Sequence, residues 1–154
     1  MPLIAELLRE LDEARALMQA TRALADAHQR IYPPWTMHQI LAHLTGWDDA
    51  TLAALRAHAG GHESGTPASE GIDAYNAQTV AEREDLAFEQ VVAEWGVARE
   101  QLKAVLEAMP LDRLTAPLVL PWGGYGTVEK LVRVMINHER EHAEEIQRLL
   151  TAPQ

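Results

Sequence analysis

Hydrophobic residues recur at intervals of three and four along five stretches of this chain, and that spacing predicts amphipathic helices. We expect helices over residues 3–28, 37–59, 73–83, 86–106 and 128–150. No stretch shows the alternation of apolar and polar residues that is typical of a half-buried strand. Four of the five helices are long, so the pattern predicts an all-α, antiparallel four-helix bundle with long loops after the second and third long helices.

Several helix starts carry capping signals. Thr36 followed three residues later by Gln39 forms a capping box, in which each side chain bonds the backbone N–H of the other residue. Thr127 is the expected N-cap of the last helix, and Asp73 is the expected N-cap of the short third helix. These signals fix where the predicted helices begin.

Prolines and glycines mark the irregular stretches. The prolines at 33–34 lack amide donors and are expected to end the first helix, as Pro110 ends the fourth. Residues 60–69 are rich in glycine and small side chains, which predicts a long loop. Residues 118–120 are apolar but lie among prolines and glycines, so we expect a short extended piece there. Gly96, inside a helix, suggests close packing or a local bend.

The length of 154 residues suits one domain, so we expect a single domain over residues 1–154. A net charge of −10 and scattered basic residues argue against a nucleic-acid partner, because binding to phosphates rests on clustered lysines and arginines. No stretch approaches the roughly 20 apolar residues of a membrane span, and none resembles a signal peptide. We therefore expect a cytoplasmic protein without a membrane partner, in which an apolar outer stripe could serve a homodimer.

Three histidines fall on apolar stripes and are the candidates for chemistry. His138 and His142 are four residues apart, so their imidazoles lie one above the other on one helix face. His43 lies on the inward stripe of the second helix. Because a buried imidazole costs free energy unless its nitrogens have partners, a shared metal ion with an open coordination position is one explanation. A polar cluster that sets helix register is the other.

The chain has no cysteine, so any metal must be held by histidine or carboxylate side chains. The stripe that carries His138 and His142 is expected to point inward as a whole, with Leu131, Met135, Ile146 and Leu149. The acidic residues near the three histidines are expected at the surface or supporting the ligands: Asp48, Asp49, Glu139 and Glu141. The other histidines lie at helix ends or in the loop, where exposed non-ligand histidines are common: His28, His38, His58 and His62.

Aromatic residues near the three histidines are pocket candidates. Trp47 follows His43 by one helical turn, although a tryptophan at that spacing more often packs in a core. Trp122 and Tyr125 precede the last helix and could line a pocket mouth. Asn76 lies near a helix start, where a short polar residue usually serves as a cap, and we leave it outside the predicted site.

The order of these motifs resembles that of a known family. Trp35-Thr36 leads into Ile-Leu-Ala-His-Leu-Thr-Gly-Trp over residues 40–47, and Asn76 and then Asn-His-Glu-Arg-Glu-His over residues 137–142 follow. This arrangement, which extends over nearly the whole chain, is similar to that of the DinB-like superfamily of metal-dependent enzymes, and also to its ClbS/DfsB-like, colibactin-protecting branch.

The resemblance implies a four-helix bundle, frequently dimeric, in which one histidine of the second helix and two of the fourth hold a divalent metal such as zinc or nickel. Matched by position, these ligands are His43, His138 and His142. Related proteins act on small molecules as hydrolases, or as transferases and isomerases that use a low-molecular-weight thiol. The resemblance therefore implies a metal centre and leaves the reaction open.

Two alternatives stay open from the residues alone. The chain could be a non-catalytic small-molecule-binding or stress-protection protein, in which the histidines or a metal are structural. A pocket that reaches the metal would favour a catalytic protein over a non-catalytic one. The bundle could also hold two metals between carboxylates, which needs Glu-x-x-His motifs on two helices. Glu139 and His142 form one such motif, and the second helix has none.

Overall fold

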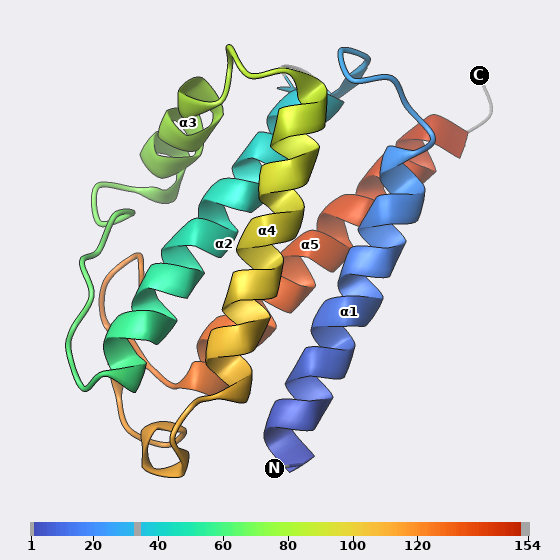
Figure 1. Cartoon of the computed structure of the whole chain (residues 1–154). Coiled ribbons are helices and arrows are strands. Elements are labelled where there is room, and N and C mark those ends of the chain that lie inside the picture. Colours follow the sequence, from blue (N-terminus) through green and yellow to red (C-terminus); the bar gives the residue numbers. More distant parts are fainter. Residues whose placement is uncertain (1, 33–34, 152–154) are drawn as a thin grey trace.

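A computed structural model of the chain describes residues 2–32 and 35–151, most of which are helical (Figure 1). The helices are α1 (Pro2–Arg22), α2 (Met37–Ala59), α3 (Ile72–Glu82), α4 (Phe88–Glu107) and α5 (Val128–Thr151), with a 3-10 turn at Leu111–Arg113. Two short antiparallel ribbons pair β1 (Arg30–Tyr32) with β2 (Trp35–Thr36), and β3 (Leu118–Val119) with β4 (Tyr125–Gly126). The predicted four-helix bundle is confirmed: α1, α2, α4 and α5 form it, and α3 packs outside it against α2.

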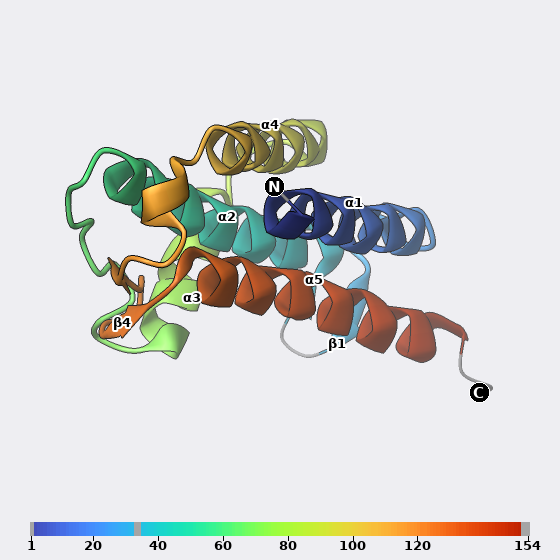
Figure 2. The same ribbon diagram turned by 90° about the horizontal axis from the view of Figure 1, so that it is seen from below.

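The long helices run up, down, down and up, so neighbours in the bundle include two parallel pairs (Figures 1 and 2). At the starts of α2 and α4 the rings of His38 and Phe88 lie 6.3 Å apart. At the other end, His58 in the last turn of α2 contacts Arg113, which follows α4. In both views α1 runs beside α5 in the same direction. The expected antiparallel order therefore fails for these two pairs, because the long loop and α3 return the chain to the end at which α2 begins.

Two of the three predicted helix caps are confirmed. The capping box of Thr36 and Gln39 is present, and the hydroxyl of Thr127 accepts a bond from the amide of Lys130 at 3.2 Å. The third prediction is wrong, because Gly71 is the N-cap of α3 and no side chain caps this helix. Asp73 lies in the first turn, where its charge still favours the positive end of the helix dipole.

The first helix ends at Arg22, earlier than the predicted residue 28. The carbonyls of Ala27 and Gln29 accept bonds from the backbone amides of His38 and Met37, at the start of α2. This pairing turns the segment back toward α2 and prevents it from continuing as a helix. The prolines at 33–34, which we expected to end the helix, lie outside the described residues.

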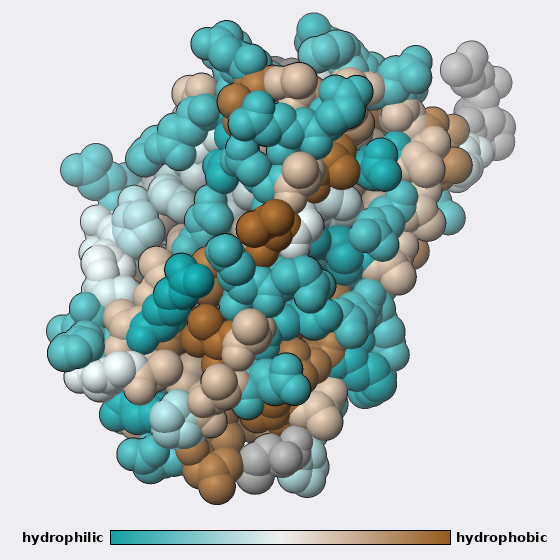
Figure 3. Space-filling view, in the orientation of Figure 1, coloured by the Kyte–Doolittle hydropathy of each residue, from teal (hydrophilic) through white to brown (hydrophobic). Residues whose placement is uncertain are grey.

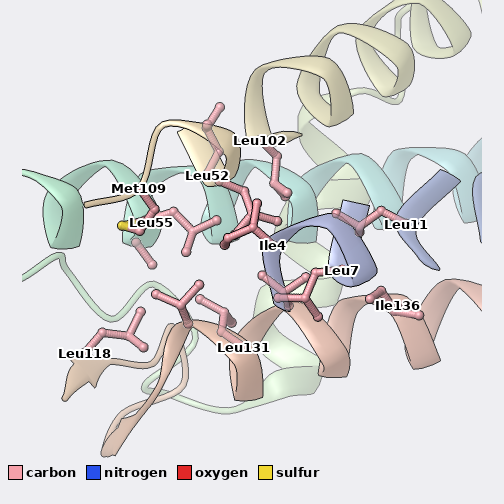
Figure 4. Packing of buried hydrophobic residues seen from close by; sticks show 14 of the residues in the cluster. Ile4, Leu7, Leu11, Leu52, Leu55, Leu102, Met109, Leu118, Leu131 and Ile136 are labelled. Atoms are coloured by element: carbon pink, nitrogen blue, oxygen red, sulfur yellow. The ribbon is translucent and has the colours of Figure 1, made fainter. Parts of the chain in front are cut away.

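Buried apolar side chains form two main clusters along the bundle. The Leu7 cluster draws on all four bundle helices and includes Ile4, Leu7, Leu11, Leu52, Leu55, Leu102, Leu106, Leu131 and Ile136 (Figure 4). The Trp95 cluster fills the other end and includes Met18, Met37, Ile40, Leu41, Leu44, Val91, Trp95, Ala143 and Ile146. On every bundle helix, the residues of one cluster precede those of the other.

A layer of four buried charges separates the two clusters, and we call it the charge layer. Each bundle helix contributes one member: Arg15 from α1, Asp48 from α2, Arg99 from α4 and Glu139 from α5. All four are 8% exposed or less. On each helix the charge lies between residues of the Leu7 cluster and residues of the Trp95 cluster.

Each arginine of the charge layer bonds both carboxylates. Arg15 donates to Glu139 at 2.8 Å and to Asp48 at 3.1 Å, and Arg99 donates to Glu139 at 2.6 Å and to Asp48 at 3.2 Å. Burial alone would raise the pKa of Glu139, but Arg99 and Arg15 together lower it, so this carboxylate is ionised at neutral pH. Arg15 also stacks over the ring of Trp95, with its guanidinium carbon 4.0 Å from the ring centre.

The buried face of α5 differs in part from the predicted one, because it carries a member of the charge layer. The buried face of α5 contains Glu139 and Ala143, while His138 and His142 lie at its edge and are partly exposed. Leu149, which we predicted to be buried, is 48% exposed. Leu131, Met135 and Ile146 are buried as predicted, but Glu139 and Ala143 occupy the core positions that the sequence pattern assigned to the two histidines.

The face over α1 and α4 is largely hydrophilic, with scattered apolar side chains (Figure 3). Among the described residues, no helix combines the length and the apolar character that a membrane crossing requires.

Replacing Glu139 with leucine leaves two buried arginines with only Asp48 as an acidic partner. We expect the free energy of unfolding to fall by about 3–5 kcal/mol, because an uncompensated buried charge is costly. Urea unfolding at pH 7 measures this loss. Glu144→Leu, at an exposed position of the same helix, is the matched control and should change stability by less than about 1 kcal/mol. Equal effects of the two substitutions would contradict the role of the charge layer.

Candidate metal centre

The structure brings the three predicted histidines together from two helices. Nε2 of His138 lies 2.9 Å from Nε2 of His43 and 3.1 Å from Nε2 of His142. One ligand atom from each residue lies within 4.8 Å of the others. His43 is 3% exposed, and the two histidines of α5 are half-buried.

This donor set fits a divalent metal ion. Three imidazole nitrogens at about 2.1 Å from one ion would lie roughly 3 Å apart when the angles at the ion are near 90°. The two contacts of His138 match that spacing, whereas the ligand atoms as a set span up to 4.8 Å and would draw closer around an ion. Hydrogen bonds alone satisfy the cluster poorly, because Nε2 of His138 faces two other Nε2 atoms and each neutral imidazole has a single N–H donor.

The surroundings keep the histidines neutral, which is the form that binds metals. Burial and the neighbouring His138 and His142 lower the pKa of His43 to about 2. Burial and His142 lower the pKa of His138 to about 4. Burial also lowers the pKa of His142, although nearby glutamates oppose the shift.

A pocket of about 550 Å³ reaches the three histidines, and this volume lies within the range of small-molecule sites. Its wall is mainly apolar and aromatic, formed by Trp35, Trp47, Ile72, Trp122, Val134 and Met135. The polar lining residues besides the histidines are Asn76, Asn137 and Glu141. Trp47 and Trp122 thus line the pocket, although core packing was the favoured prediction for Trp47. Tyr125 is 66% exposed and bonds Glu63 instead.

Helix α3 supplies one wall of the pocket because it packs closely on α2. A Cβ atom at Gly46 would overlap with the side chain of Thr79, so glycine is needed there. The hydroxyl of Tyr75 donates to the carbonyl of Gly46 at 2.7 Å, and the indole N–H of Trp47 donates to the side-chain oxygen of Asn76 at 2.8 Å. Asn76, which we had left out of the site, therefore fixes the orientation of a pocket tryptophan. Gly96, where close packing was one expectation, has open space around it.

The four acidic residues near the histidines in sequence have different surroundings. Asp48 and Glu139 belong to the buried charge layer, and Asp49 pairs with Arg83 at 2.7 Å. Only Glu141 lines the pocket. Because Glu139 bonds Arg15 and Arg99, the alternative of a carboxylate-bridged di-metal site loses its one Glu-x-x-His motif.

Two histidines outside the cluster are buried, contrary to the expected exposure. His38 donates from Nε2 to the carbonyl of Leu86 at 2.8 Å, and His58 donates from Nε2 to the carbonyl of Arg113 at 2.6 Å. Both therefore have backbone partners and lie outside the histidine cluster. His28 and His62 are exposed, as predicted.

Sequence reasoning missed the two arginines of the charge layer. Arg15 follows Leu11 by four residues and Arg99 follows Trp95 by four, so both stand on apolar stripes. A charge at such a position is the signal that could have revealed them.

The sequence matches one known protein family. The sequence profile of the DinB superfamily matches residues 6–146, which is most of the chain. The chain belongs to the DinB superfamily. No curated protein matches the sequence.

Two similar solved structures share the fold of this DinB protein. The mycothiol-dependent maleylpyruvate isomerase is 14% identical, with a TM-score of 0.79, and the match covers 93% of this chain. This chain spans only 60% of the length of that isomerase. The colibactin self-resistance protein ClbS is 16% identical, with a TM-score of 0.80 over 98% of this chain and 97% of ClbS.

The ClbS structure corrects one expectation. From the net charge of −10 we excluded a nucleic-acid partner, yet ClbS, with the same fold, was solved in complex with dsDNA. That exclusion is wrong, because phosphates are contacted by individual local groups, so net charge cannot rule them out.

Acid should destabilise the metal-free protein through these histidines. As the pH falls below 6.5, histidines in the unfolded chain take up protons, while His138 in the folded chain remains neutral until about pH 4. The unfolded state then binds more protons, so the free energy of unfolding decreases. Between pH 6.5 and 5, the native sequence should lose up to about 2 kcal/mol more than His138→Gln.

Urea unfolding of chelator-treated protein at pH 6.5 and pH 5 measures this difference. His62→Gln, at an exposed loop position, should retain the full pH dependence of the native sequence. The same pH dependence in His138→Gln and in the native sequence would contradict the explanation.

Proposed function

We propose that this protein is a divalent-metal-dependent enzyme that acts on a small molecule, with His43, His138 and His142 as the metal ligands. The observation that carries the proposal is the convergence of three neutral imidazoles at a pocket of about 550 Å³. Zinc and nickel suit a site made of imidazole nitrogens. Because the ligand set comes from three side chains, coordination positions facing the pocket stay open to a reactant.

The side chains around the histidines have separate tasks in this proposal. A bound divalent ion would lower the pKa of a coordinated water or thiol and polarise a substrate oxygen. His43, His138 and His142 hold it without adding negative charge. Trp47, kept in place by Asn76, and Trp122 exclude water and contact the apolar part of the substrate.

Transfer to or from a low-molecular-weight thiol is the reaction that we place first. The chain has no cysteine, so a thiol nucleophile must come from a second small molecule. The pocket has room for a thiol beside a small substrate, and a mycothiol-dependent isomerase shares the fold. Hydrolysis is the second candidate, because the same open positions would also accept water.

A non-catalytic binding or stress-protection protein is the alternative from another class. A pocket that reaches all three histidines supports catalysis over this alternative, because a purely structural metal site is closed by protein ligands.

Metal content tests the proposed ligands. Full-length protein purified without an affinity tag and without chelator should contain close to one divalent ion per chain by elemental analysis. His138→Ala combined with His142→Ala should remove most of it, because a single remaining imidazole cannot hold the ion. His62→Ala should keep the native content. A native protein without stoichiometric metal, or an unchanged metal content in the double variant, would exclude this site.

Thiol dependence separates the two reactions. We expect the metal-loaded protein to consume a small electrophile, such as an activated aryl halide or an epoxide, only when a low-molecular-weight thiol is present. The double variant should show the uncatalysed rate. Turnover of ester or amide substrates that is independent of thiol would instead support hydrolysis.

A further inference from the structure

The charges around the pocket are unbalanced. Histidines apart, Glu141 is the one ionisable side chain among the described residues that line the pocket. No lysine or arginine lines it in the described part of the chain. The buried arginines Arg15 and Arg99 each bond both Asp48 and Glu139. A negative group on a ligand body would therefore meet a carboxylate and find no cation in the protein wall.

Three tryptophans line the same pocket, and two of them contact each other. The ring centres of Trp47 and Trp122 lie 6.2 Å apart with an angle of 61° between the planes. Trp35 lies edge-on to His43 at 4.7 Å. Indole faces attract cations as well as apolar groups, because their π-electrons carry partial negative charge.

From these two observations we infer that the pocket selects ligands by charge. It takes a small molecule with an apolar or aromatic body and no negative charge away from the group that faces the histidines. An ammonium group on that body strengthens binding through Glu141 and the indoles. This inference rests on the proposed function for the reacting end of the ligand, and specifies the chemistry of the other end.

The net negative charge of the protein also disfavours anionic ligands. The chain has 23 acidic and 13 basic residues, so the protein's long-range field slows the approach of small anions, although it does not exclude local contacts with phosphates. Within the pocket, low-dielectric walls make an unpaired carboxylate costly. A ligand carboxylate that lies away from the histidines is therefore disfavoured both during the approach to the protein and within the pocket.

Three benzyl thiols of nearly equal size test the inference. They carry, opposite the thiol, an aminomethyl group (positive), a hydroxymethyl group (neutral) or a carboxylate (negative). Each is titrated into the full-length protein at pH 7, metal-free and zinc-loaded, with tryptophan fluorescence as the readout. We expect the amine to bind at least about fivefold more tightly than the carboxylate in both states, and the alcohol to lie between them.

Two substitutions on α5 assign the effect to Glu141. Glu141→Gln should reduce the advantage of the amine over the alcohol to the part that the indoles contribute. Glu144→Gln removes an exposed charge from the same helix outside the pocket lining, and should leave the order of affinities unchanged.

The outcomes separate this inference from the proposed function. Equal affinities, tighter binding of the carboxylate, or no binding of any probe would overturn charge selection. If the order of affinities holds but the protein takes up no metal, the metal-dependent function fails and charge selection stands. If metal binds but the order is absent, charge selection alone fails.

Discussion

Two arginines and two carboxylates, buried at one level of the bundle, align its four helices. Removing four charges from water is costly, and the cost is offset only when every charge keeps its partners. Arg15, Asp48, Arg99 and Glu139 achieve this because each arginine bonds both acids. A shift of any one helix along its axis would break two of these pairs, so the layer sets the register of all four helices.

This register also positions the histidines. Glu139 directly follows His138 in α5, and Asp48 lies five residues after His43 in α2. The same two arginines hold both acids, so α1 and α4 fix the spacing between the histidine-bearing helices without lining their site. The charge layer and the histidine cluster are thus two consequences of one alignment of α2 with α5, one inside the bundle and one at its pocket side.

The sequence predicted the bundle and the proximity of the three histidines, because helical spacing shows which side chains share one face of each helix. Helical periodicity located the long helices, and the four-residue spacing of His138 and His142 put them on one face. It could not give the parallel pairing of α2 with α4, which depends on the path of the loop and α3. Nor could it show that Glu139 is the core residue, because the partners that make its burial tolerable, Arg15 and Arg99, come from distant parts of the chain.

We propose that a DinB bundle whose helix register is set by buried charges presents three neutral imidazoles to one divalent ion at an aromatic pocket. Crystal diffraction at the absorption edge of the metal found in the untagged protein tests it most directly. We expect one anomalous peak about 2.0–2.1 Å from Nε2 of His43, His138 and His142, the length of metal–imidazole bonds. A peak elsewhere, or no peak between these histidines in metal-replete crystals, would contradict it.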